Sequence, residues 1–260
     1  MRLEVIPFGT PSERPPLLFV HGAFSGAWVW AEHFLPFFSE AGWSGAALSL
    51  RGHGISEGRS WLHLLGIEDY LADIADVAAT LGRPPVVVGH SLGSLLVQLH
   101  IRQHPVAGLV VLSGLPPWGL APSAQGMALR HPVLVWQLTL LQTLGPWAVD
   151  GDFIASSLFS DATPRERIAQ LMPRFQRESE RATFEAMFPR LPPWSPRPTP
   201  TLVIGGDKDP YVSIREVRGT AEAWSGDLAI IPGLPHALML DATWREPATT
   251  MEKWLVKRFG

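Results

Sequence analysis

Short apolar runs alternate along the chain with stretches of helical period. The runs are rich in Val, Leu, Ile and Ala and lie at 17–22, 45–50, 85–90, 107–114, 201–206 and 227–233. Residues 67–82 instead repeat apolar side chains every three or four positions, with acidic ones on the other faces, which predicts an amphipathic helix. The alternation predicts parallel strands joined by crossover helices. We therefore expect an α/β fold with a mostly parallel central sheet and helices on both faces.

Further elements are predicted near the two ends of the chain. The segment LEVIPF (3–8) is a candidate first strand, and helical periods recur near 213–224 and 245–259. Asp241 or Thr243 would cap the last helix, because short polar side chains accept hydrogen bonds from the first free N–H groups of a helix.

The alternation stops between Leu115 and about Pro200. Pro-rich stretches border this segment, LPPWGLAP on one side and LPPWSPRPTP on the other, and its interior has helical periods without a convincing strand. The sequence therefore predicts a core domain built from residues 1–114 and 201–260. A helical insertion at 115–200 is carried on the strand that ends at Gly114.

Composition narrows the classes of function. The chain has 260 residues and no cysteine, which excludes disulfides and thiolate metal sites. Its formal net charge of −3 gives no basic footprint for nucleic acid, so no nucleic-acid partner is expected. No apolar run approaches the roughly 20 residues that span a bilayer, so no membrane span is expected. Glu4, Pro7 and Pro11 stand where a signal peptide would need an apolar core, which predicts a cytoplasmic location.

The segment VVVGHSLGS contains the clearest candidate for chemistry. Gly89-His90-Ser91-Leu92-Gly93 follows a predicted buried strand and precedes a predicted helix. In that context the pattern Gly-x-Ser-x-Gly predicts a sharp turn that holds the serine in a strained conformation at the carboxyl edge of the sheet. Ser91 is therefore a candidate nucleophile, and the helix that begins at Leu92 directs free N–H groups toward it.

A second loop at the same edge offers further hydrogen-bond donors. His21-Gly22-Ala23-Phe24 follows the apolar run LLFV, and Gly22 permits a tight turn there. We expect the backbone N–H of Leu92, together with that of Ala23 or Phe24, to form an oxyanion hole.

A base and an acid are expected on two later loops. Asp207 and Asp209 follow one predicted strand, and His236 follows the next. Because the carboxyl ends of parallel strands meet at one edge, these side chains can converge on Ser91. The chain order is Ser, Asp, His, with two candidate carboxylates two residues apart.

Several of these motifs together resemble those of the α/β-hydrolase fold superfamily. They occur in the family's order and span nearly the whole chain: HGAFSGAWVW (21–30), RGHG (51–54), GHSLG (89–93), GGDKDP (205–210) and PHALMLD (235–241). The resemblance implies Ser91 as nucleophile, Asp209 as the acid and His236 as general base and acid. It also implies that 115–200 is the family's helical cap, and it implies no cofactor.

The residues at these positions exclude some relatives. Haloalkane dehalogenases and epoxide hydrolases of this fold use a carboxylate where this chain has Ser91, and the lysine of hydroxynitrile lyases is missing after His236. We therefore predict a serine hydrolase that cleaves carboxylic esters of apolar, small-to-medium substrates through an acyl-enzyme on Ser91. The alternatives are a cofactor-free perhydrolase or haloperoxidase, a carbon–carbon bond hydrolase, or a non-catalytic receptor for a small ligand.

Aromatic and aliphatic residues of the insertion and of the HGAF loop are candidate walls of an apolar pocket. They are Phe24, Trp28, Leu115, Trp118, Trp136, Leu138, Trp147, Phe153, Phe184 and Phe188. The remaining histidines lack the spacing of metal ligands, so no metal site is expected, and His53 and His90 are predicted to be structural.

Overall fold

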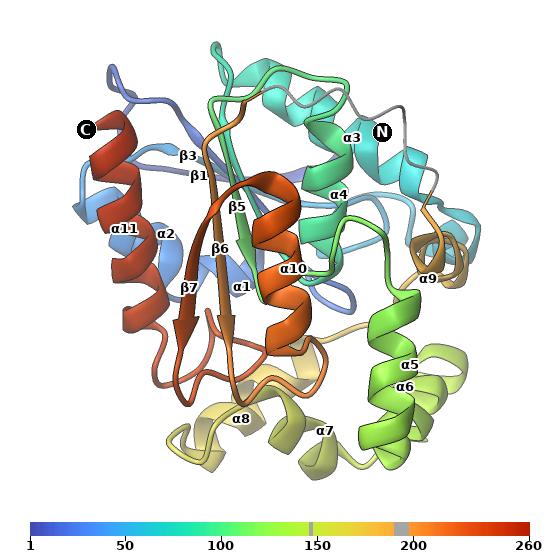
Figure 1. Ribbon diagram of the computed structural model, residues 1–260. Helices are drawn as coiled ribbons and strands as arrows, with labels where there is room; N and C mark the ends of the chain where they lie inside the picture. Colours follow the sequence, from blue (N-terminus) through green and yellow to red (C-terminus); the bar gives the residue numbers. More distant parts are fainter. Residues whose placement is uncertain (146–147, 190–197) are drawn as a thin grey trace.

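The computed structural model describes residues 1–145, 148–189 and 198–260, and at its centre is a seven-stranded sheet (Figure 1). The strand order is β1-β3-β2-β4-β5-β6-β7, and every neighbouring pair is parallel except β1 and β3. The mostly parallel sheet is therefore confirmed. The strands are β1 (Glu4–Phe8), β2 (Leu17–Val20), β3 (Gly45–Ser49), β4 (Val86–His90), β5 (Gly108–Leu112), β6 (Thr201–Gly206) and β7 (Asp227–Ile231).

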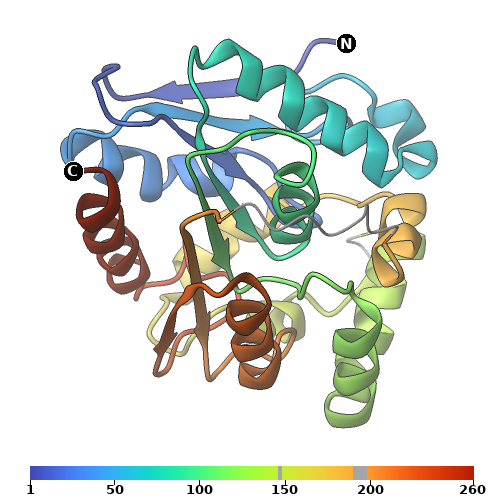
Figure 2. The same ribbon diagram turned by 45° about the horizontal axis from the view of Figure 1, so that its top comes forward.

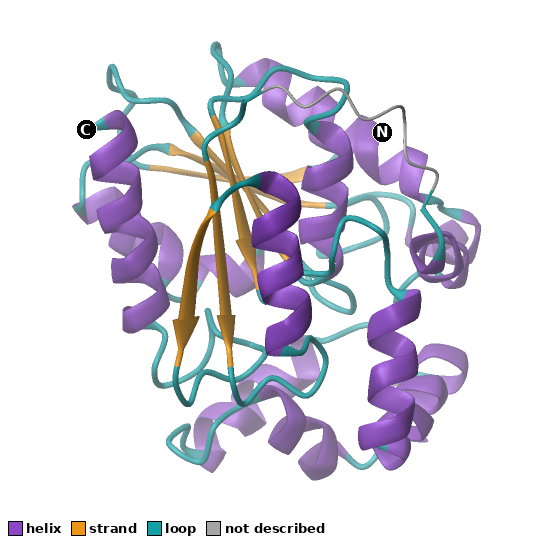
Figure 3. Ribbon diagram, in the orientation of Figure 1, coloured by secondary structure: helices purple, strands orange, loops and turns teal. Residues whose placement is uncertain are grey.

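Helices cover both faces of this sheet (Figure 3), which explains why its central strands are apolar at successive positions. In β2, Leu17 and Phe19 pack into the core on one face, and Leu18 and Val20 pack into the core on the other. The first face is covered by α1 (Trp28–Ala31), α2 (Phe34–Glu40) and α11 (Arg245–Phe259). The second is covered by α3 (Ile67–Thr80), α4 (Leu92–His100) and α10 (Ile214–Trp224).

The segment between β5 and β6 is helical in its described part, as predicted. Helices α7 and α8 lie beyond the carboxyl ends of β6 and β7, and α5 and α6 stand to one side of the sheet in both views (Figures 1 and 2). The elements are α5 (Ala121–Arg130), α6 (Pro132–Leu144), α7 (Gly151–Leu158), α8 (Arg165–Leu171), the 3₁₀ turn η3 (Met172–Arg174) and α9 (Glu180–Met187); a further 3₁₀ segment, η1 (Arg59–Leu64), precedes α3.

The predicted cap of the last helix is wrong. Trp244 occupies the N-cap position of α11, and no side chain caps it. The Asp241 carboxylate instead accepts hydrogen bonds from the backbone N–H of Ser160 at 2.8 Å and from the hydroxyl of Thr163 at 2.7 Å. Asp241 therefore ties the segment after α7 to the loop after β7, and its Oδ1 also accepts the backbone N–H of Thr243 at 2.9 Å, in the turn that precedes α11.

Among the described residues, no helix combines the length and the apolar character needed to cross a membrane.

Candidate active site

Ser91 lies between β4 and α4 in a backbone conformation that few side chains adopt. Its φ is 50° and its ψ is −120°. The turn is possible because both flanking glycines lie against other backbone atoms: a Cβ at Gly89 would be 2.5 Å from the Gly93 oxygen, and one at Gly93 would collide with the carbonyl of His21. Packing therefore holds the strained serine at the carboxyl edge of the sheet.

The structure brings the three predicted side chains into one hydrogen-bonded chain. The Ser91 hydroxyl lies 3.1 Å from Nε2 of His236, and Nδ1 of His236 lies 2.8 Å from Oδ2 of Asp209. Since a carboxylate only accepts, Nδ1 carries the proton and Nε2 is free to accept the one on Ser91. The side chain of Asp209 is only 1% exposed, so this contact is shielded from water.

Asp209, and not Asp207, is the carboxylate that faces the imidazole. Its second oxygen, Oδ1, accepts the backbone N–H groups of Tyr211 at 2.8 Å and Val212 at 3.1 Å, which fixes its orientation. Asp207 is exposed and accepts the N–H of Gly233 at 2.6 Å. The two candidates left open by the sequence are thus separated by geometry.

His90 supports the loop that carries His236. Its Nε2–H donates to the backbone carbonyl of His236 at 2.9 Å, and the two rings are 4.8 Å apart. Burial, with the neighbouring His236, lowers the pKa of His90 well below its ordinary value, so the ring is neutral. The structural role expected for His90 is consistent with these contacts.

The predicted oxyanion loop packs directly against this turn. A Cβ at Gly22 would be 2.8 Å from Nδ1 of His90 and 2.9 Å from Cβ of Ser91, so only glycine fits. Ala23, Phe24 and Leu92 line the same cavity as Ser91. Within the described residues, none of their backbone N–H groups donates to a backbone acceptor. All three are therefore free to bind a developing oxyanion.

Ser91 and His236 open into a cavity of about 470 Å³ whose walls are mostly apolar. The segment between β5 and β6 provides much of the wall, with Met127 from α5, Leu138 from α6 and Ile154 from α7. Of the predicted wall residues, Phe24, Leu115 and Leu138 line the cavity.

The prediction is wrong for Trp118 and Trp136. Trp118 is 43% exposed and packs against α10 at Gly219, and Trp136 is 61% exposed. The residues of α6 that line the cavity do not include Trp136; they are Val135, Leu138, Thr139, Leu141, Gln142 and Thr143.

Other predicted wall residues also lie elsewhere. Trp28 packs edge-on to Phe175 beneath the guanidinium of Arg174, and Phe153 joins a small cluster with Met127 and Leu134. Neither is among the described residues that line the cavity. Phe184 and Phe188 are exposed, and Trp147 lies outside the described residues.

Tyr211 was missed by the sequence reasoning. Its ring lies 4.4 Å from that of His236 and lines the cavity, and its hydroxyl shares a 2.6 Å hydrogen bond with Ser157 of α7. Burial raises the pKa of this phenol, so it stays protonated. Its position directly after Asp209 and Pro210 was the available signal, since any residue there follows the acid into the site.

No cluster of three or more potential metal ligands exists in the described part of the chain. His33 stacks on Trp244 and His100 on His104, and His53 pairs with Glu178. The histidines outside the Ser91 site are thus engaged with other side chains or, like His63 and His131, exposed at the surface.

Comparison with known proteins places this site in a family. A model of the alpha/beta hydrolase family matches residues 17–248, whereas no curated protein sequence matches the chain. Similar solved structures include a monoacylglycerol lipase from Paleococcus ferrophilus (21% identity, 99% of this chain and 100% of that chain, TM-score 0.71). A thermophilic esterase from Thermogutta terrifontis is also similar (19% identity, 99% and 94%, TM-score 0.72).

A third similar structure is BpoC from Mycobacterium tuberculosis H37Rv, described as a candidate non-heme bromoperoxidase (20% identity, 100% of this chain and 97% of that chain, TM-score 0.71). At such low identities these structures establish the fold alone. The family model covers most of the chain and includes Ser91, Asp209 and His236. The chain therefore belongs to the alpha/beta hydrolase family.

Proposed function

We propose that the protein is a serine hydrolase that cleaves carboxylic esters of apolar, small-to-medium substrates through an acyl-enzyme on Ser91. The observation that carries the proposal is the hydrogen-bonded chain from Ser91 through His236 to Asp209, with its serine end in an apolar cavity. A nucleophile, a base and a residue that orients the base are the parts that acyl transfer needs.

In the first half of the reaction, the Ser91 oxygen attacks the ester carbonyl while its proton moves to Nε2 of His236. Asp209 keeps Nδ1 protonated and stabilises the imidazolium that forms. The carbonyl oxygen becomes an oxyanion, and the free N–H groups of Leu92 and of Ala23 or Phe24 stabilise it. His236 then gives the proton to the leaving alcohol as its carbon–oxygen bond breaks, which leaves the acyl group on Ser91.

The second half runs the same steps with water. His236 takes a proton from water, whose oxygen attacks the acyl carbonyl, and then returns that proton to the Ser91 oxygen as the ester bond to the enzyme breaks. The carboxylic acid leaves and the serine is restored. No metal or cofactor takes part in these steps.

The cavity supports an apolar substrate of limited size. Its volume of about 470 Å³ lies within the range of about 300–1,000 Å³ that is typical of small-molecule sites. We further propose that residues 115–200 act as a cap, since α5, α6 and α7 supply wall residues opposite the core. The cap would then set the length of acyl chain that fits.

A panel of p-nitrophenyl esters of increasing acyl length tests the proposal, alongside labelling with a fluorophosphonate. We expect hydrolysis, a serine-linked adduct at Ser91, and loss of both in Ser91→Ala. A wild-type protein that binds apolar esters but neither hydrolyses them nor forms the adduct would make it a receptor. Activity that needs peroxide and a short carboxylic acid would make it a perhydrolase.

A further inference from the structure

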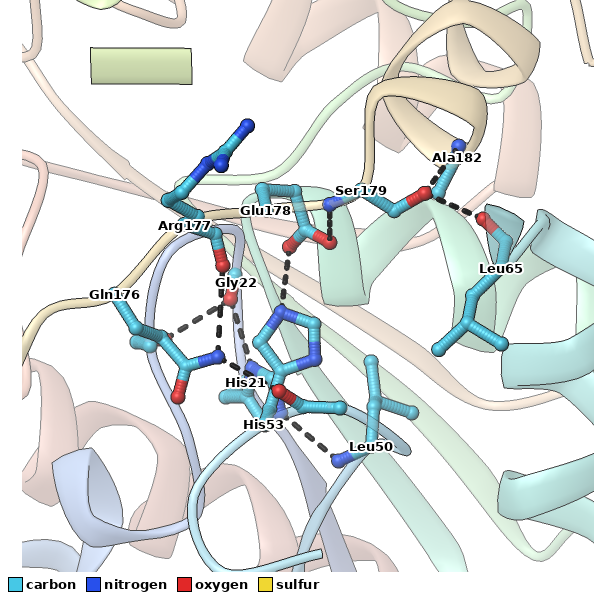
Figure 4. A network of polar contacts seen from close by, with 12 residues as sticks. His21, Gly22, Leu50, His53, Leu65, Gln176, Arg177, Glu178, Ser179 and Ala182 are labelled. Atoms are coloured by element: carbon cyan, nitrogen blue, oxygen red, sulfur yellow. Dashed lines mark hydrogen bonds and ion pairs between the residues drawn. The ribbon is translucent and has the colours of Figure 1, made fainter. Parts of the chain in front are cut away.

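A buried ion pair lies outside the residues that the proposed reaction uses (Figure 4). His53, from the RGHG turn at 51–54, and Glu178 are both almost completely inaccessible to solvent, and Nε2 of His53 lies 3.1 Å from Oε2 of Glu178. Glu178 belongs to residues 175–179, which connect η3 to α9 and which we call the strap. The pair therefore joins the segment between β5 and β6 to the core.

The hydrogen bonds of this pair are complete. Nδ1 of His53 faces the carbonyl of Arg51 at 3.1 Å, so both ring nitrogens face oxygen acceptors. The other oxygen of Glu178 accepts the Tyr70 hydroxyl at 2.8 Å and the Ser179 N–H at 2.7 Å. Burial opposes the charge, but His53 and these donors hold the pKa of Glu178 below its ordinary value.

The strap is bound to the RGHG turn at a second point. Nε2 of Gln176 donates to the carbonyl of Gly52 at 2.9 Å, and the N–H of Gly54 donates to Oε1 of Gln176 at 3.0 Å. The turn and the strap thus form one hydrogen-bonded unit, with His53 and Glu178 in its buried part.

The strap in turn fixes the predicted oxyanion loop. The backbone N–H of Gln176 donates to the carbonyl of Phe24 at 2.8 Å, and Phe24 has an unusual φ of 63°. On the other side, the carbonyl of Gly22 accepts Nδ1–H of His21 at 2.8 Å (Figure 4). It also accepts the hydroxyl of Ser25 at 2.9 Å. The N–H groups of Ala23 and Phe24 therefore lie between two fixed carbonyls.

His21 also has a defined protonation state. Its Nε2 accepts the N–H of Leu50 at 3.0 Å, so Nδ1 carries the only proton and donates it to Gly22. Burial, with the neighbouring His53, lowers the pKa of His21 to about 3, which keeps the ring neutral. The loop is thus held from the core by His21 and from the strap by Gln176.

We propose that His53 and Glu178 are positioning residues for the reaction proposed above: through the strap they hold the Phe24 carbonyl, and with it the N–H donors that bind the oxyanion. Neither side chain contacts substrate. This inference rests on the proposed function, and it gives the RGHG turn a role in catalysis at a distance. Because a donor displaced by about 1 Å stabilises the transition state poorly, loosening the strap lowers kcat more than it raises KM.

Three substitutions test the role. Glu178→Ala removes the link. Glu178→Gln keeps the link but removes the charge. The amide oxygen of the Gln accepts from Tyr70 and Ser179, and its NH₂ donates to Nε2 of a neutral His53. Nδ1–H of that His53 still donates to the carbonyl of Arg51. Glu180→Gln is the matched control, since Glu180 lies two residues away and forms an exposed ion pair with Arg177.

The kinetic test measures kcat and KM separately, for an ester that the wild type hydrolyses. We expect Glu178→Ala to lose on the order of 10- to 100-fold in kcat with KM changed less than about threefold, since loss of one oxyanion donor costs about 10²–10³. Glu178→Gln is expected to recover kcat to within about threefold of wild type, and Glu180→Gln to leave it unchanged. Equal kcat in wild type and Glu178→Ala would overturn the proposal, as would a rise in KM alone.

A second readout isolates the oxyanion. An alkyl trifluoromethyl ketone adds to Ser91 and places an oxyanion in the hole, whereas the methyl ketone of the same length adds poorly. We expect Glu178→Ala to raise the inhibition constant of the trifluoromethyl ketone in proportion to its loss in kcat/KM. The inhibition constant of the methyl ketone should stay unchanged. Equal weakening of both ketones would assign Glu178 to the pocket wall and overturn the positioning role.

Hydrogen exchange separates this inference from the proposed function. In Glu178→Ala we expect residues 22–27 to lose protection together with the strap, whatever reaction the protein performs. Loss confined to residues 175–182 would overturn the link, and absence of ester hydrolysis in wild type would overturn the function alone. If Glu178→Ala does not fold, Gln176→Ala cuts the contacts to Gly52 and Gly54 without leaving a buried charge, and the same shared loss is expected there.

Discussion

Replacing Asp209 by Asn changes which imidazole nitrogen carries the proton. Oδ1 of Asp209 accepts two backbone N–H groups, from Tyr211 and Val212, so an Asn there must keep its carbonyl oxygen on that side. Its NH₂ then takes the place of Oδ2, which lies 2.8 Å from Nδ1 of His236. Because an NH₂ only donates, Nδ1 must become the acceptor and the proton moves to Nε2. Nε2 can then no longer accept the proton of Ser91.

We expect Asp209→Asn to lower kcat for a p-nitrophenyl ester on the order of 10⁴-fold, about 5 kcal/mol in the barrier, as a wrong tautomer does in other triads. The fold should persist, because the amide oxygen still accepts from the loop. Asp207→Asn is the matched control: Asp207 accepts a single N–H, from Gly233, and an amide oxygen replaces it. Steady-state rates of both variants, with urea unfolding to check stability, decide the matter. An active Asp209→Asn or an inactive Asp207→Asn would refute the assignment.

Two other predictions concern the nucleophile and the cavity wall. Ser91→Ala and His236→Ala should each remove nearly all ester turnover, and the double variant should be no worse, because the residues act as a unit; additive losses measured in the same assay would contradict this. Leu138→Trp, in the cavity wall, should shift the preferred acyl length downward and leave acetate esters nearly unaffected, while Trp136→Ala, on the exposed side of α6, should change neither. A shift in acyl length in the Trp136 variant would contradict the structural assignment.

The strands of the core could be predicted from the sequence, because a strand buried on both faces is apolar at consecutive positions. A strand such as Val86–His90 is apolar at each of its first three positions, and the glycines around Ser91 are required by contacts with the adjacent turn and with His21. Sheet topology predicted that the loops carrying Asp209 and His236 meet near Ser91, since all three stand at carboxyl ends of parallel strands, whereas the choice of Asp209 over Asp207 came from the family resemblance.

The inner wall of the cavity could not be predicted in the same way. Helix α6, PVLVWQLTLLQTL, carries apolar residues around most of its circumference, so its sequence does not define which face turns inward. Trp136 is the largest side chain on it and is exposed, while Leu138 and Val135 face the cavity. Side-chain size predicts burial only where another element is present to cover it.

The hydrogen-bond partners of buried polar groups could not be predicted from the sequence either. Glu178 lies in the charged stretch QRESER, which is typical of a solvated helix, and its partner His53 is 125 residues away. Likewise, Asp241 was expected to cap the last helix, but its Oδ2 accepts hydrogen bonds from Ser160 and Thr163. A single sequence carries no local sign of such long-range hydrogen bonds.

Acid should destabilise the fold through buried neutral histidines, and His100 gives the clearest test. Both of its ring nitrogens are buried and have no hydrogen-bond partner among the described residues. Burial, with the adjacent His104, lowers its pKa to about 4 from an ordinary value of 6.5. Between pH 6.5 and about pH 4, His100 is therefore protonated in the unfolded chain but neutral in the folded chain. Its neutral burial costs no stability above pH 6.5, and the free energy of unfolding falls as the pH drops from 6.5 to about 4.

At pH 5, about 1.5 units below the ordinary histidine pKa, proton binding to the unfolded chain at this site lowers the free energy of unfolding by about 2 kcal/mol. Replacing His100 by Leu removes the titrating group while keeping an apolar side chain of similar size in the same space. We expect the loss of unfolding free energy between pH 8 and pH 5, measured with urea, to be about 2 kcal/mol smaller in His100→Leu than in wild type. The remainder of the wild-type loss should persist, because burial also lowers the pKa values of His21 and His90. An equal loss in both proteins would show that the His100 imidazole is already protonated in the fold at pH 5, with a partner supplied by solvent.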